Sequence, residues 1–160
     1  MCPPPQPPPS PSSQARSEHP VQVAVALLPQ DDRFLLQLRD NVPGIPYPGQ
    51  WGFFGGHLEA GEDPITGLLR ELEEEIGYKP RAAVQLFGEY PDDRINRYIF
   101  HTPLTVPIDQ LVLGEGWDFK LVTVAEIRAG EVWSEVAQET RPIGVLHRQI
   151  LLDFIATRPA

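Results

Sequence analysis

The apolar residues of this chain fall into short runs and amphipathic segments, separated by turns rich in glycine and proline. Two early runs, residues 21–28 and 34–39, flank the turn signal Gln30-Asp31-Asp32, so we expect two buried strands paired as a hairpin. Short extended pieces are also expected on either side of Gly55-Gly56. Later segments with strand character are residues 82–89, 95–101 and 119–122.

Residues 64–76 carry the clearest helical pattern. Asp63 is a good N-cap, Pro64 suits the first helical position, and Gly77 supplies a stop. At about 100° per residue, one side of this helix is apolar and another is acidic. The apolar stripe consists of Ile65, Leu69, Leu72 and Ile76. The carboxylates that project together are Glu71, Glu74 and Glu75.

The remaining pattern completes a mixed chain. A short helix is expected over residues 124–128, and Pro142 opens a last amphipathic helix. Its apolar side contains Ile143, Leu146, Ile150 and Phe154. No internal repeat is visible. Because strands and helices intermix within 160 residues, the pattern predicts one α/β or α+β layered sandwich, spanning residues 19–158.

The first 18 residues differ from the rest in composition. They are rich in Pro and Ser and bury too little surface to offset the entropy of ordering, so we expect a disordered tail. The single cysteine, Cys2, lies in this tail, which excludes a disulfide framework and a cysteine-rich zinc site. The sequence has neither a membrane-length apolar run nor the apolar core of a secretory signal. We therefore expect a soluble, cytoplasmic protein with no membrane partner.

The charge balance narrows the class of ligand. With 13 basic and 22 acidic side chains, the formal net charge is −9, which argues against binding a nucleic-acid backbone through a broad electrostatic patch. Small phosphate compounds remain possible ligands, because divalent cations can lie between an acidic site and an anion.

The acidic side of the 64–76 helix is the main candidate for such a site. An acidic run on a helix is most often a solvated face, but here its surroundings favour a function. Gly55-Gly56 allows close approach of the backbone, Glu59 and Glu62 add carboxylates, and Arg70 can pair with one of them. Clustered carboxylates repel one another, and a hard cation such as Mg²⁺ or Mn²⁺ removes that penalty.

The segment from Gly56 to Tyr78, GHLEAGEDPITGLLRELEEEIGY, resembles the signature box of the Nudix (MutT-like) hydrolases. That box has Gly, five residues, Glu, seven residues, and then Arg-Glu-aliphatic-x-Glu-Glu-x-Gly-aliphatic. The matching residues are Gly56, Glu62, Arg70, Glu71, Leu72, Glu74, Glu75 and Gly77. Only Tyr78 departs from the pattern, at a packing position. The resemblance implies the family's α/β/α sandwich with a mixed β-sheet.

The resemblance also implies roles for the matching residues. Glu71, Glu74 and Glu75 correspond to the family's metal ligands, and the Gly56 carbonyl is a further one. Arg70 corresponds to the arginine that orients these glutamates. Glu62 corresponds to its partner or an outer-shell ligand, and Gly77 is structural. The implied reaction is hydrolysis of a diphosphate linkage in a nucleoside diphosphate derivative, with metal ions activating water and a glutamate as general base.

The identity of that base is open. The loop Leu113-Gly114-Glu115-Gly116 resembles one that returns an acidic residue to the site, so Glu115 is our candidate for base or fourth ligand. The alternatives are that Glu115 is an exposed turn residue, or that Asp118 takes the role.

Residues outside the box supply candidates for substrate contacts. Arg39 ends the second strand beside the proline-rich loop 40–50 and could bind a phosphate, with a solvated arginine as the alternative. Three aromatic residues could stack on a base or simply pack: Tyr47, Trp51 and Phe53. We expect structural roles for His57 and His101.

Two rival functions are weaker. A non-catalytic Nudix-like nucleotide-binding or regulatory module would not need to retain the glutamates, and all are present. An isomerase on the same scaffold would need a reactive cysteine, and the only one is Cys2. The substrate is left open among oxidised nucleoside triphosphates, ADP-ribose, nucleotide sugars and dinucleoside polyphosphates. The apolar residues of loop 40–50 would permit a homodimer.

Overall fold

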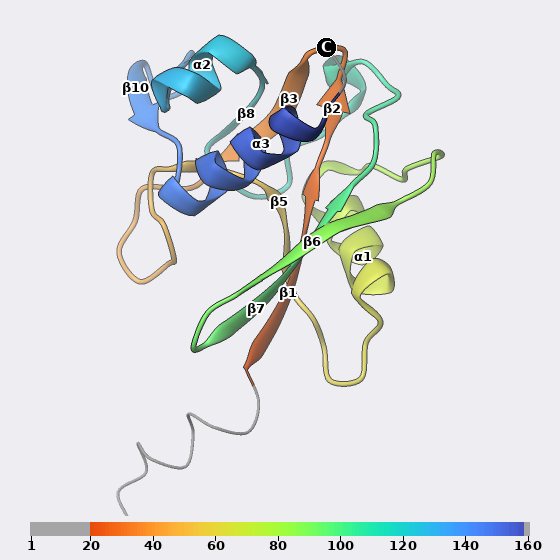
Figure 1. The fold of residues 1–160 in the computed structure, drawn as a ribbon. Helices are drawn as coiled ribbons and strands as arrows, with labels where there is room; N and C mark the ends of the chain where they lie inside the picture. The colour runs from red at the N-terminus through yellow and green to blue at the C-terminus, as the bar shows by residue number, and fades with distance from the viewer. Residues whose placement is uncertain (1–19, 159–160) are drawn as a thin grey trace, which may run out of the picture.

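The computed structural model describes residues 20–158, so the predicted tail and Cys2 lie outside the described residues. The strands within that range are β1 (Val21–Leu27), β2 (Pro29–Gln30), β3 (Arg33–Leu38), β4 (Trp51–Gly52), β5 (Phe54–His57), β6 (Gln85–Pro91), β7 (Ile95–His101), β8 (Asp118–Thr123), β9 (Glu131–Ser134) and β10 (Glu139–Pro142). The helices are α1 (Pro64–Ile76), α2 (Val124–Ala129) and α3 (Val145–Thr157), with a 3₁₀ turn at Ile108–Gln110. Figure 1 shows α1 and α3 on opposite sides of the long strands.

The sheet that positions the candidate site has the strand order β5-β1-β7-β6. β1 pairs antiparallel with β5 and parallel with β7, so the sheet is mixed, as predicted. Successive residues of β1 point to opposite faces. Ala24 and Ala26 belong to the core beneath α1, whereas Val23 and Val25 line a pocket on the other face. The two faces of one strand therefore serve packing and function separately.

A second group of strands lies beneath α3. β3 pairs with β2, β4 and β8. Its Phe34, Leu36 and Leu38 are buried in one core with Ile150 and Phe154 of α3. The rings of Phe34 and Phe154 meet edge to face, with 5.9 Å between centroids. With α1 on its own core and α3 on this one, the predicted α/β/α sandwich is confirmed.

Helix α1 begins and ends as its sequence predicts. The Asp63 carboxylate accepts a hydrogen bond from the Thr66 N–H (3.2 Å), and Pro64 occupies the first turn. Gly77 ends the helix in the left-handed conformation, with φ of 65°. None of the helices in residues 20–158 is long and apolar enough to cross a membrane.

The predicted apolar stripe of α1 was partly wrong. Ile65 and Leu69 are each 37% exposed, and Leu68 is fully buried beside Leu72. The helix is rotated relative to the expectation, and this rotation brings Glu75 to 5% exposure. One carboxylate of the acidic side therefore points inward rather than to solvent.

The predicted hairpin between the first two runs was also wrong in its pairing. β1 pairs with β5 and β7, and only the short extension β2 pairs with β3, with Pro29 opposite Phe34. Because β1 is a central strand of the mixed sheet, strands distant in sequence occupy both of its edges.

Two further boundaries differ from expectation. Gly55-Gly56 lies inside β5 rather than between two extended pieces. Residues Glu139–Pro142 form a strand paired with β9, and α3 starts only at Val145. Pro142 suits this place because an edge strand tolerates a missing N–H.

Candidate active site

A pocket of about 700 Å³ opens on the face of the mixed sheet opposite α1. Its floor comes from β1 and β7, and its sides come from β5, α1, α3, the loop 40–50 and the loop 114–116. Segments distant in sequence therefore meet around one concave space, which is the usual setting of a small-molecule site.

One wall of this pocket is acidic. Glu71 and Glu75 of α1 and Glu115 of the glycine turn all line it. The Gly55 N–H donates a hydrogen bond to Glu75 Oε2 (3.3 Å). Burial, reinforced by the negative charges of Glu71 and Glu115, raises the pKa of Glu75 to about 8, against the lowering effect of the Gly55 bond. The surroundings of Glu75 therefore disfavour its charged form, and a bound cation would stabilise that form.

The glycines of β5 make this arrangement sterically feasible. A Cβ on Gly56 would lie 2.8 Å from the Glu71 carboxylate. Gly55 has φ of +140°, and a Cβ there would lie 2.2 Å from the Ala24 carbonyl oxygen. The absence of side chains at Gly55 and Gly56 lets the α1 carboxylates lie against this edge strand and line the pocket.

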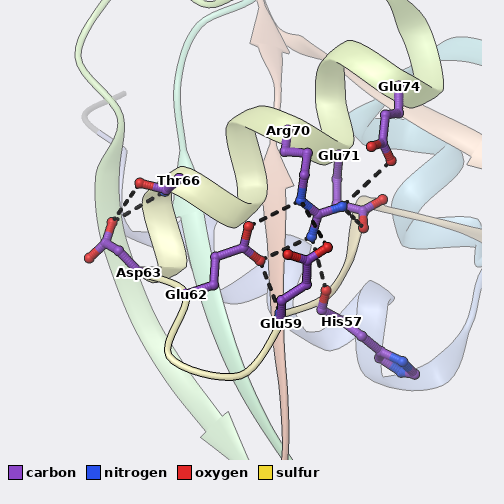
Figure 2. Close-up of polar contacts among 8 residues, drawn as sticks. All are labelled: His57, Glu59, Glu62, Asp63, Thr66, Arg70, Glu71 and Glu74. Carbon is purple, nitrogen blue, oxygen red and sulfur yellow. Dashed lines mark hydrogen bonds and ion pairs between the residues drawn. The ribbon is translucent and has the colours of Figure 1, made fainter.

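Arg70 fixes the acidic side chains in place (Figure 2). Its Nε and Nη2 donate to the two oxygens of Glu62, at 3.1 and 3.0 Å, and Nη1 donates to Glu71 at 3.0 Å. The same Nη1 lies 3.5 Å from Glu74, and Nη2 donates to the His57 carbonyl at 3.4 Å. The Arg70 bond holds the pKa of Glu62 below its usual value. Arginine's planar fork makes such a multidentate network, which lysine cannot reproduce.

The loop carrying Glu115 is docked on the end of α1. The Gly114 N–H donates to the Glu75 carbonyl (2.7 Å), and a Cβ on Gly114 would lie 2.8 Å from the Glu74 carbonyl oxygen. This close contact places Glu115 on the pocket. Asp118, its rival, is buried and accepts a hydrogen bond from Ser134 Oγ at 2.7 Å, so its carboxylate serves a structural contact.

The other candidates separate into two groups. Arg39, Tyr47 and Phe53 line the pocket. Trp51 is fully buried, and its indole donates to the Val132 carbonyl (3.2 Å), so it lies in the core and not on the pocket.

The two histidines predicted as structural also differ in their placement. The His57 side chain is exposed at the rim of the pocket. His101 packs beside Phe154, with 5.1 Å between ring centroids.

The sequence analysis missed several pocket residues, among them Arg97 and His147. Arg97 lies between Ile95 and Ile99 on one side of β7, and a charge at an inward position of a strand is a signal that could have revealed it. His147 lines the pocket from the first turn of α3. Nothing in its local sequence distinguishes it.

The donor chemistry fits a hard divalent cation. Among residues 20–158, no three His, Cys, Asp or Glu side chains stand in a ready-made metal cluster. Glu71 and Glu74 instead contact Arg70. Carboxylate oxygens next to a bare glycine backbone are the ligands that Mg²⁺ and Mn²⁺ prefer.

Comparison with known proteins agrees with this fold. The family model of the NUDIX domain matches residues 18–148, and the chain belongs to the Nudix family. It is similar to the RNA pyrophosphohydrolase of Acidiphilium cryptum, at 38% identity over 71 residues, and to that of a Nitratiruptor species, at 34% over 64. These stretches cover 44% and 40% of this chain but only 40% and 36% of the relatives' own lengths.

A solved structure shows the same fold across most of the chain. It is a MutT from a study of the Aliivibrio salmonicida and Vibrio cholerae proteins. It superposes with a TM-score of 0.67 at 21% identity, covering 88% of this chain and all of that one.

Proposed function

We propose that this Nudix protein is a metal-dependent hydrolase that cleaves a diphosphate linkage in a small nucleotide derivative. The observation that carries the proposal is one pocket with an acidic wall, Glu71, Glu75 and Glu115, and a separate cation, Arg39. The diphosphate of such a compound would bind metal ions at the acidic wall, and a further anionic or polar part would bind Arg39.

The proposed roles combine the resemblance to the Nudix box with the pocket lining by Glu71, Glu75 and Glu115. Glu71, Glu74 and Glu75, with the Gly56 carbonyl, would hold Mg²⁺ or Mn²⁺, which polarises a phosphate and lowers the pKa of a water molecule when bound. Arg70 orients Glu71 through its 3.0 Å bond. Glu115, on the same wall, is proposed as the base that accepts the proton of the attacking water.

Arg39 is proposed to bind a phosphate oxygen. Its Nε is buried without a hydrogen-bond partner among the described residues, and no carboxylate of that part of the chain lies within 4.0 Å of its guanidinium. An unpaired buried donor is costly, so an anionic acceptor would remove that cost. Tyr47 and Phe53 flank the same pocket.

The experiment is release of phosphate or nucleoside monophosphate from a panel of nucleotides, with Mg²⁺, Mn²⁺ or chelator. The panel contains nucleoside triphosphates, ADP-ribose, nucleotide sugars, dinucleoside polyphosphates and an RNA with a 5′-triphosphate, since two relatives are named for RNA. We expect metal-dependent turnover of a small nucleotide that is lost in the double variant E74Q/E75Q.

Glu73→Gln is the matched control. It removes one carboxylate from the same helix, but Glu73 pairs with Lys79 (3.3 Å) and does not line the pocket. Turnover by the double variant would refute the assignment. No turnover of any compound by folded, metal-loaded protein would favour the nucleotide-binding module. We also propose a cytoplasmic location, no nucleic-acid or membrane partner, and a homodimer, which sedimentation can test.

A further inference from the structure

His147 of α3 is fixed in one orientation where it lines the pocket. Its ring lies parallel to that of Phe53, with 4.9 Å between centroids and 5° between planes, and Tyr47 lies against it at 5.8 Å. A Cβ on Gly52 would come within 2.2 Å of Nδ1. The Gly144 N–H, just before α3, donates to the Trp51 carbonyl (3.0 Å). The ring is therefore closed in on several sides and meets open space only at the pocket.

The contacts of this ring determine which nitrogen carries the proton. Nδ1 accepts the Phe53 N–H at 3.1 Å, so the neutral ring carries its proton on Nε2. Burial, and then the charges of Arg97 and Arg39, lower the pKa of His147 to about 4, so the ring is neutral at physiological pH. Nε2–H has no hydrogen-bond partner among residues 20–158. His147 thus presents one uncharged donor to the pocket.

Arg97 presents a second donor from the floor. Its Nη1 donates to Asp92 Oδ2 (2.9 Å) and to the Tyr90 carbonyl (3.4 Å), and the side chain is 10% exposed. Nε and Nη2 have no hydrogen-bond partner in the described part of the chain, and Arg97 lines the pocket. Because Asp92 holds Nη1, the guanidinium is fixed and its remaining N–H groups have a defined direction.

These donors suit a planar, uncharged acceptor better than a second phosphate. His147 is neutral and Arg97 is already paired, whereas a phosphate would be best served by unpaired cations. The adjoining floor is apolar, formed by Val23, Val25, Ile95 and Ile99. Apolar walls with a few fixed donors at one edge are typical of a pocket for a heterocyclic base.

We propose that Arg97 and His147 recognise the base of the nucleotide and select a purine that presents a 6-keto oxygen beside N7, as guanine and hypoxanthine do. Both of those atoms accept hydrogen bonds, and arginine is the commonest partner of this edge. Adenine instead places a donor amino group at the same position. The inference rests on the proposed function, because it assumes that the phosphates of the nucleotide lie at the acidic wall.

The test compares kcat and KM for GTP, ITP and ATP with Mg²⁺, together with calorimetric binding of GMP, IMP and AMP. His147→Asn keeps an acceptor for the Phe53 N–H but lacks the Nε2 donor, and His147→Gln extends an amide donor into the pocket. Arg97→Lys removes the fork. Arg94→Lys is the control, since Arg94 is exposed on the same hairpin and does not line the pocket.

We expect the wild type to favour GTP and ITP over ATP by roughly 5- to 150-fold in kcat/KM. His147→Asn and Arg97→Lys should abolish this preference through KM, with kcat unchanged, and His147→Gln should restore part of it. Metal-dependent hydrolysis without base preference, or preference that survives in both variants, overturns the base assignment and leaves the hydrolase intact. If no compound of the phosphate-release panel is cleaved but GMP binds more tightly than AMP through these two residues, the base assignment stands and the hydrolase proposal fails. If GMP binds no more tightly than AMP, the base assignment fails whether or not a compound is cleaved.

Discussion

Replacing Glu75 by Gln should stabilise the metal-free protein while removing its metal site. Glu75 is 5% exposed and its pKa is raised from 4.5 to about 8, mainly by burial. Gln keeps the shape of the side chain and an oxygen to accept the Gly55 N–H. The change therefore removes the need to protonate this carboxyl on folding, at little cost in packing.

The magnitude follows from the two pKa values. Between pH 4.5 and 8 the folded protein retains a proton that the unfolded chain has released, so the free energy of unfolding falls as the pH rises. At pH 7 this difference amounts to at most about 3 kcal/mol for Glu75. In a domain of this size it corresponds to roughly 6–12 °C in Tm.

The assay is thermal unfolding of the wild type and Glu75→Gln in chelator across pH 4–9. We expect the two Tm values to converge near pH 4 and to diverge as the pH rises to 8, with the variant higher. Excess Mg²⁺ should then raise the Tm of the wild type much more than that of the variant. A Tm difference that does not change with pH would falsify the account of a destabilised buried carboxylate. Glu73→Gln, on the exposed side of the same helix, should show no such divergence.

Three further substitutions test Glu115 and the two residues that hold Glu71 in place. Gly56→Ala should displace the Glu71 carboxylate, which would lie 2.8 Å from the new Cβ, and weaken Mg²⁺ binding at least tenfold by calorimetry; unchanged affinity would show that Glu71 does not bind the ion. Arg70→Lys loses the bidentate contact with Glu62 and should lower turnover by 10- to 100-fold, the range typical of outer-shell partners, while near-native rates would remove Arg70 from the orienting role. Glu115→Gln should reduce kcat at least 100-fold with little change in KM if Glu115 is the base, and a rate within threefold of the wild type would exclude it.

The sequence could bring Glu71 and Glu75 together because both lie within one local segment, whereas Glu115 comes from a distant loop. The spacing from Gly56 to Gly77 places the carboxylates on α1 and the glycine before it, and the caps at Asp63 and Gly77 define the helix. The part of the pocket lined by Arg97 and His147 depends on contacts between residues that are distant in sequence. Arg97 reaches it through the parallel pairing of β1 with β7, and His147 through the docking of α3 on β4.

Trp51 is another residue whose placement could not be predicted from the local sequence. Its position in an aromatic segment left both stacking on a base and packing in the core open. Its indole instead donates to Val132, a carbonyl 81 residues away, in a hairpin that was not predicted. A residue whose partner lies that far along the chain cannot be assigned to core or pocket from its neighbours alone.

The mixed sheet divides the molecule into two separately packed cores. Glu71 and Glu75 of the acidic wall lie on α1, whose Leu68 and Leu72 are buried in one core. His147 lies on α3, whose Ile150 is buried with Phe53 in the other core. A nucleotide that contacts both the acidic wall and His147 would therefore join the two cores, which otherwise meet along the strands of the sheet. Hydrolysis of the diphosphate would break that link between the part of the nucleotide at the acidic wall and the part that carries the base.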